Sequence, residues 1–195
     1  MSSKIQLLEN LYKKFSNCLQ CPLGNLGRKN IVFGTGNPES HIMLIGEGPG
    51  EKEDLSGKPF VGRSGQLLTK LLHIAGIDRN TIFISNIVKC RPPNNRKPTS
   101  IETTTCTNLI LFEQIKIIKP TIIGTLGATA LTGFRSGPTK ITVERGLKFH
   151  WNNITIIPTF HPAYLLRNPD SIEDFLKDLI QIETLSRHLT PQDQK

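Results

Sequence analysis

An amide, an imidazole and a glycine-rich stretch stand at the ends of separate apolar segments of this sequence. Asn86 lies toward the end of TIFISNIVKC, His161 ends ITIIPTFH, and the glycine-rich stretch 46–68 follows HIMLIG and contains a single Phe60. An amide offers both a hydrogen-bond donor and an acceptor, and an imidazole can donate, accept or exchange a proton. Together they would make a pocket with one amide and one imidazole.

The elements that must position these groups alternate between strand and helix patterns. Isoleucine-rich apolar runs, which are typical of buried parallel strands, occupy 31–33, 41–46, 81–90, 121–127 and 154–161. Helices are predicted over 4–16 and 64–76, and capping boxes at 99–102 (TSIE) and 170–173 (DSIE) open two more. The alternation predicts an α/β fold in which helices cover both faces of a mostly parallel sheet.

The predicted fold places the reactive groups together, because ligands of open parallel sheets bind beyond the carboxyl ends of the strands. Gly46 to Gly50, Asn86, Gly124 to Gly127 and His161 all lie at such ends. Each has a plainer explanation: the glycines could serve a tight turn, Phe60 could be core, and Asn86 and His161 could be structural. The convergence of four segments on one edge favours a pocket.

Four cysteines form a second constellation. Cys18 and Cys21 make a C-x2-C pair after the first helix, Cys90 closes the second main strand, and Cys106 lies inside the helix that begins near residue 99. In a chain without a secretion signal, this pattern indicates a metal more than disulfides. Zinc and an iron-sulfur cluster are both compatible with the spacing, and unrelated buried cysteines are the remaining alternative.

Length and charge limit the number of domains and the kinds of partner that this chain can have. We expect one domain over 1–188 and a polar tail over 189–195 of this 195-residue chain. A formal charge of +8 and a pI near 9.5 suit a polyanionic partner such as nucleic acid, although many other proteins are equally basic. Because neither a membrane span nor a signal peptide is recognisable, we expect a cytoplasmic protein with no membrane partner.

Five blocks of the sequence together resemble the family 4 uracil-DNA glycosylases of bacteria and archaea. They are GEGPGEKED, GKPFVGRSGQLL, SNIVKCRPPNNRKP, GTLGATAL and HPAYLLRNP, in this order and with the cysteines so placed. The resemblance runs from about Cys18 to Phe175. One departure is GEGPG for the usual GEAPG, so that Gly48 replaces an alanine, which we expect to loosen the loop slightly.

The resemblance implies a three-layer α/β/α sandwich around a central four-stranded parallel sheet. It also implies a [4Fe-4S] cluster with a structural role, held by Cys18, Cys21, Cys90 and Cys106. The implied activity is base-excision repair: a uracil is flipped out of single- or double-stranded DNA and its N-glycosidic bond is hydrolysed.

The same resemblance implies roles for the pocket residues. Gly46 and Gly48 would line the base pocket, Phe60 would stack on the flipped uracil, and Asn86 would bond uracil O4 and N3 but not cytosine. His161 would donate a hydrogen bond to uracil O2 as negative charge develops there. Better-known uracil glycosylases position water with an aspartate where this chain has Gly48, so backbone groups or Glu47 would hold the water.

The remaining predictions concern DNA. Leu165 and Leu166 are predicted to wedge between bases, and Arg167 to contact phosphate or fill the vacated stack, unless residues 164–166 simply begin a core-packed helix. Lys58, Arg63 and the basic loop 91–97 are expected to add positive charge for phosphate contacts. We expect a monomer and identify no motif for a protein partner. A non-catalytic DNA-binding protein and a related specificity, such as covalent capture of the abasic product, are the alternatives. The segment 132–149 contains no histidine like that of crosslinking relatives, which favours ordinary hydrolysis.

Overall fold

One six-stranded sheet organises the chain, whose computed structural model describes residues 2–135 and 137–188. The strand order is β1-β3-β2-β4-β6-β5. The bounds are β1 Thr35–Gly36, β2 Ile42–Gly46, β3 Phe83–Asn86, β4 Ile122–Leu126, β5 Phe149–Trp151 and β6 Ile154–Thr159. The inner four strands are parallel, as predicted, and the short β1 and β5 pair antiparallel at the two edges.

Alternating side chains of the buried strands build a core on each face of the sheet. Met43 and Ile45 of β2 join one apolar cluster, and Ile42 and Leu44 join the other. Such strands, buried on both faces, read as continuous apolar runs. The apolar residues 31–33 are buried but lie outside the sheet, so the strand predicted there is wrong.

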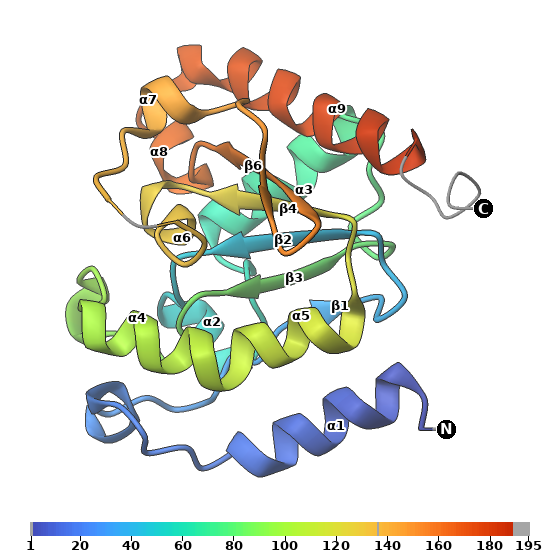
Figure 1. Ribbon diagram of the computed structural model, residues 1–195. Helices are drawn as coiled ribbons and strands as arrows, with labels where there is room; N and C mark the ends of the chain where they lie inside the picture. The colour runs from blue at the N-terminus through green and yellow to red at the C-terminus, as the bar shows by residue number, and fades with distance from the viewer. Residues whose placement is uncertain (1, 136, 189–195) are drawn as a thin grey trace.

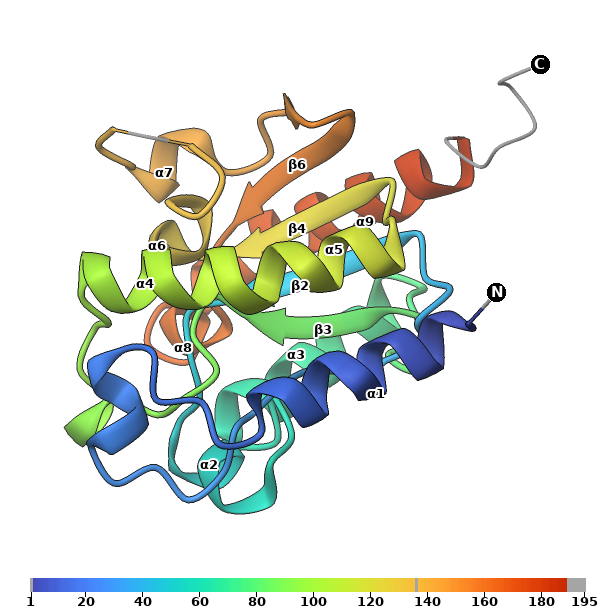
Figure 2. The ribbon, with the colours of Figure 1, turned by 60° about the horizontal axis from the view of Figure 1, so that its bottom comes forward.

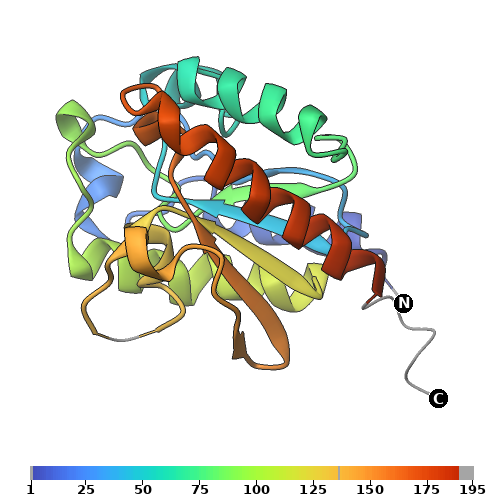
Figure 3. The same ribbon diagram turned by 90° about the horizontal axis from the view of Figure 1, so that it is seen from above.

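Helices cover both faces, which confirms the predicted layers (Figures 1 and 2). On one side lie α1 Lys4–Phe15, α4 Ser100–Cys106 and α5 Phe112–Ile118. On the other side α3 Arg63–Ile74 and α9 Ile172–His188 run next to each other (Figure 3). None of the helices within the described residues is long and apolar enough to cross a membrane.

The helix over 100–118 begins with the predicted capping box. Thr99 accepts from the backbone N–H of Glu102, and the Glu102 carboxylate accepts from the backbone N–H of Thr99. Between α4 and α5 the helix passes through a π-helical segment, Thr107–Leu111. By contrast, α9 is entered through a 3-10 turn, Pro169–Ser171, so the capping box predicted at 170–173 is wrong.

Short helices follow the carboxyl ends of the strands and form the edge where the reactive groups lie. They are α2 Glu51–Ser56 after β2, α6 Ala128–Leu131 after β4 and α8 Pro162–Leu165 after β6. A further short helix, α7 Ile141–Glu144, precedes β5, and the 3-10 turns Pro22–Asn25 and Pro93–Asn95 lie in the first loop and after β3. In Figure 1 the arrowheads of the parallel strands β2, β3 and β4 point left, toward this edge.

Candidate active site

A cavity of about 530 Å³ opens at the carboxyl ends of β2, β3 and β6. Its walls come from the glycine-rich stretch, the end of β3, the loop 91–98 and the start of α8. They comprise Glu47, Gly48, Pro49, Gly50, Glu53, Phe60, Ser64, Asn86, Pro92, Asn95, Arg96, Pro98, His161, Ala163, Tyr164 and Arg167. The prediction that separate segments bring an amide and an imidazole to one edge of the sheet is therefore confirmed.

The pocket floor depends on the close approach of Phe60 and Asn86 to Gly46. Gly46 pairs with Asn86 across the parallel strands β2 and β3. A Cβ atom on Gly46 would lie 2.4 Å from Asn86 Oδ1 and 2.6 Å from Phe60 Cζ, closer than real Cβ contacts allow. Only glycine leaves room here for the amide and the aromatic ring together.

Asn86 carries a buried side-chain oxygen that the described protein does not pair, as do Thr107 and Thr125, but only Asn86 among the three lines this cavity. Its side chain is 1% exposed, and its Oδ1 has no hydrogen-bond partner within the described protein. A buried polar atom without a partner costs about 1–3 kcal/mol, so such atoms call for an explanation. A ligand in the cavity that donates to this oxygen would remove that cost.

His161 is held as a neutral donor opposite this amide. It caps α8, and its Nδ1 accepts a hydrogen bond from the backbone N–H of Ala163 at 3.1 Å. Burial, with a smaller contribution from the positive charge of Arg167, lowers the pKa of His161 to about 4. With Nδ1 used as an acceptor, the proton of the neutral ring sits on Nε2, which is free to donate. The ring centroids of Phe60 and His161 are 5.8 Å apart.

Gly48 lies close to Val88. A Cβ at this position would lie 2.7 Å from Cγ2 of Val88, so an alanine here would require Val88 to move. The absence of a methyl group thus makes room for Val88, and the expectation that glycine loosens the loop stays a prediction. Glu47, its half-buried neighbour, lies on the cavity wall, where a water-positioning group would be needed.

Sequence reasoning assigned no role to Glu53 and predicted only general positive charge from the loop 91–97, whose Asn95 and Arg96 also line the cavity. The Arg96 guanidinium is held by the buried Glu102 carboxylate through hydrogen bonds of 2.8 and 2.7 Å. The capping residue of α4 thereby also fixes a cation at the pocket mouth. The four carboxylates of the stretch 47–54 were the available signal for Glu53, although their partners are far along the chain.

The residues predicted to contact DNA separate into two groups. Leu165 is 1% exposed and packs in the core with α3 and α9, so its predicted role as a wedge is wrong. Leu166 is 42% exposed, and Arg167 lies exposed on the cavity wall. Arg63 and Lys58 are exposed outside this cavity. The alternative that residues 164–166 begin a core-packed helix is thus confirmed for Leu165. Its side chain faces the core, whereas that of Leu166 is exposed.

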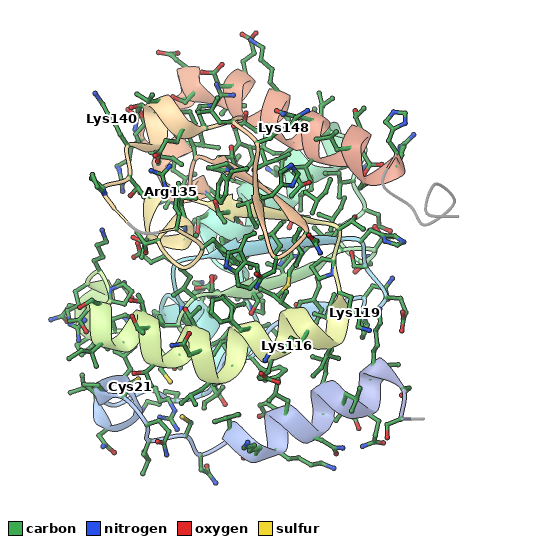
Figure 4. All side chains as sticks on the ribbon, in the orientation of Figure 1. Cys21, Lys116, Lys119, Arg135, Lys140 and Lys148 are labelled. Atoms are coloured by element: carbon green, nitrogen blue, oxygen red, sulfur yellow. The ribbon has the colours of Figure 1, made fainter. Side chains whose placement is uncertain are left out.

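The four cysteines border a second, much smaller cavity of about 10 Å³. All four thiols are free, and Figure 4 shows Cys21 between the Pro22–Asn25 turn and α4. Within residues 2–135 and 137–188, no three metal-ligating side chains are arranged so that they could already hold an ion. Burial raises the pKa of Cys90 to about 12 and that of Cys106 to about 11, so a metal would have to displace their protons.

Lys89 lies between the two cavities and was not foreseen. Its side chain is fully buried, and its Nζ donates to Ser85 Oγ at 2.6 Å, to Asn86 O at 2.8 Å and to Gln114 Oε1 at 2.8 Å. All three donors of an ammonium group are used. Burial lowers the pKa of Lys89 to about 7, while Cys106 and Cys90 act in the opposite direction. The backbone of Asn86 is therefore fixed from the side of the cysteines.

This chain is similar to proteins of one known superfamily. The family model described as "Uracil DNA glycosylase superfamily" matches residues 33–181. A Type-4 uracil-DNA glycosylase of Thermotoga maritima is 49% identical over 170 residues, which are 86% of this chain and 88% of the relative. A Type-4 uracil-DNA glycosylase of Sulfurisphaera tokodaii is 41% identical over 194 residues, which are 95% of this chain and 86% of the relative.

Proposed function

This chain belongs to the uracil DNA glycosylase superfamily, and we propose that it removes uracil from DNA by hydrolysing the N-glycosidic bond, leaving an abasic site. The observation that carries the proposal is the unpartnered Oδ1 of Asn86, which shares one cavity with Phe60 and the neutral His161. An amide, an aromatic face and a neutral donor are the groups that a flipped pyrimidine requires.

Uracil satisfies the Asn86 amide in full. The N3–H of uracil donates to Oδ1, and uracil O4 accepts from Nδ2, so the buried oxygen gains the partner that it lacks within the protein. Cytosine has an unprotonated N3 and an amino group at position 4, which reverses both requirements. A mismatch would leave buried polar groups unpaired at a cost of about 1–3 kcal/mol each.

His161 assists the departure of the base. As the glycosidic bond breaks, the sugar gains positive charge and uracil gains negative charge at O2. The Nε2–H of His161 donates a hydrogen bond to that oxygen, while Nδ1 is kept as an acceptor by the Ala163 backbone. Because the pKa of His161 is about 4, the ring stays neutral and acts by hydrogen bonding rather than as a charged acid at neutral pH.

Two polar side chains of the cavity wall are available to position the attacking water. Glu47 and Asn95 both line the cavity, and Gly48 supplies no side chain. The Oδ1 of Asn95 already accepts from Arg91 Nε at 2.8 Å, which leaves its NH2 group free to orient a water molecule. An oxocarbenium-like sugar reacts with a weakly activated nucleophile, so a strong base at residue 48 is not required.

DNA would lie across the mouth of the cavity. Arg96 and Arg167 border the opening and suit the phosphate backbone, whose contacts give affinity without sequence preference. Leu166 is the exposed apolar side chain beside them and suits insertion into the gap that the flipped base leaves.

The donor set fits a [4Fe-4S] cluster, which requires four thiolates. Cys18, Cys21, Cys90 and Cys106 would hold it, since all four are free and border one cavity. When bound, such a cluster would supply a structural crosslink between the segment after α1, the segment after β3 and α4. Zinc also accepts four thiolates, so absorbance near ~400 nm in anaerobically purified protein is the distinguishing measurement.

Base release from labelled oligonucleotides tests the proposed function. One strand carries a single uracil opposite guanine, and a matched strand carries thymine at the same position. We expect cleavage of the uracil strand only, and only after alkali, because hydrolysis leaves an intact backbone. Tight DNA binding without release would favour the non-catalytic alternative, and release of a different deaminated base would favour a related specificity.

A further inference from the structure

We propose that Glu53 and Arg79 are positioning residues that hold Phe60 in place for base stacking before DNA binds. This inference rests on the proposed function, since it assigns the stacking of the flipped base to Phe60. Neither residue was assigned a role from the sequence. The support comes from the backbone of Phe60 and from the groups that surround it.

Phe60 has a backbone conformation that it would not keep alone. Its φ of +53° lies in the left-handed region, which bulky residues other than glycine rarely adopt. Such a residue persists where the surrounding structure fixes it, and such positions cluster at ligand sites. The ring itself is only 6% exposed at the cavity wall. Neighbouring groups must therefore hold residue 60 in this conformation.

Glu53 holds the chain directly after Phe60. The carboxylate lies on α2, is 8% exposed, and its Oε1 accepts from the backbone N–H of Val61 at 2.9 Å and of Gly62 at 2.7 Å. Hydrogen bonds to a charged acceptor are among the stronger ones in proteins. One carboxylate oxygen therefore fixes two successive peptide groups.

Arg79 holds the chain directly before Phe60. Its Nη2 donates to the carbonyl of Pro59 at 2.8 Å, and its Nη1 donates to Thr69 Oγ1 at 2.8 Å, which orients the guanidinium on α3. Burial lowers the pKa of Arg79, and the negative charge of Glu53 acts in the opposite direction. An anion and a cation thus hold the two sides of one strained residue.

Gly65 and Gly46 allow the backbone and the ring of Phe60 to pack closely against their neighbours. A Cβ on Gly65 would lie 2.0 Å from both C and O of Phe60, so the backbone of residue 60 rests directly on α3. The ring rests in turn on Gly46. With its neighbours tied and its backbone and ring both seated, Phe60 is fixed without a ligand. A preorganised aromatic face spares the binding of a flipped base the cost of ordering this loop.

The test compares two non-cleavable DNA ligands. One duplex carries a 2′-fluorinated deoxyuridine, which presents a base to Phe60, and the other carries a tetrahydrofuran abasic analogue, which presents none. We expect Glu53→Ala and Arg79→Met each to weaken binding of the uracil duplex about tenfold and to leave the abasic duplex within about twofold, as loss of a base–aromatic stack would. Equal weakening of both ligands, or of neither, would overturn the proposal.

Asp54→Asn is the matched control for Glu53. Asp54 is the next residue of α2, is 3% exposed, and also accepts from backbone N–H groups, but those belong to Lys29 and Asn30. We expect no change in the preference for the uracil duplex in this variant. A preference lost equally in Asp54→Asn would mean that any damage to α2 has this effect, and the proposal would fall.

Two further measurements separate positioning from general damage. In a Phe60→Ala background, Glu53→Ala should add no further loss of uracil-duplex binding, because its effect passes through the ring. Amide hydrogen exchange at Val61 and Gly62 should accelerate in Glu53→Ala, and unchanged exchange would contradict the clamp whatever the activity. If the unaltered protein itself does not prefer the uracil duplex, the proposed function fails instead.

Discussion

The base pocket and the cysteine cavity lie on two sides of the end of β3 and are stabilised in different ways. At the pocket, the buried Glu53 carboxylate and the half-buried Arg79 guanidinium each bind backbone groups of the Phe60 loop, and Asn86 Oδ1 is left for a ligand. Around the cysteine cavity, the buried thiols of Cys90 and Cys106 have raised pKa values, and all four cysteines that line the cavity are free. The pocket is therefore formed before its ligand arrives, whereas the cysteine region would be completed only by the proposed cluster.

Removing the His161 imidazole should cause the largest change in activity. We expect His161→Ala to lower the single-turnover rate of uracil release by about a hundred- to a thousandfold, the usual effect of losing one oxyanion donor. DNA affinity should change far less than the rate, and the melting temperature should fall by only about 2–6 °C, because the variant also loses the Nδ1 cap of α8. An unchanged rate would remove His161 from the reaction.

Changing the Asn86 amide tests recognition separately from chemistry. Asn86→Asp should slow uracil release by roughly ten- to a hundredfold, since one buried pairing becomes unfavourable. Cytosine release should become detectable, because a carboxylate accepts from the cytosine amino group. Parallel assays on uracil and cytosine strands measure the ratio, and an equal loss on both bases would show that the amide does not read this edge.

A cysteine substitution should act on stability first. Cys90→Ser is expected to abolish absorbance near ~400 nm and to lower the melting temperature by about 5–10 °C, on the scale of ~2–4 °C per kcal/mol for a domain of this size. Phe60→Ala in the pocket serves as the control and should retain the absorbance. If Cys90→Ser retains full absorbance and stability, the cysteine region does not depend on a bound group.

The smallest expected effect is in the pH profile. The pKa of His161 in the folded protein is about 4, below its ordinary value near 6.5, so the ring stays neutral from pH 8 down to about 5. The single-turnover rate should show no inflection near pH 6.5. Between pH 6.5 and 4 the unfolded chain binds more protons at this histidine, so its contribution to stability is lost as the pH falls. A rate inflection near 6.5 would show that the ring is not held neutral.

The sequence predicted the inner sheet and the meeting of the pocket residues because long apolar runs and strand-end positions are local signals. It missed β1 and β5, which are too short to leave a pattern and form only by pairing at the edges. It placed Leu165 on the surface, because two adjacent leucines on a single helical turn do not reveal which one faces inward. Glu53 and Arg79 form hydrogen bonds with backbone groups 8 and 20 residues away. No regular residue spacing predicts contacts of this kind from the sequence.

The π-helical segment Thr107–Leu111 sets the rotational phase of the helix that carries Cys106. In an unbroken α-helix, eight residues at ~100° each would leave Gln114 about 80° out of line with Cys106. One extra residue taken up by the π turn reduces that difference to roughly 20°. Both side chains are then buried beside Lys89, to which Gln114 is hydrogen bonded. Deleting a single residue within 107–111 should therefore restore a regular α-helix without moving Gln114 away from Lys89, because Gln114 would then follow Cys106 by seven residues, an offset of the same roughly 20°.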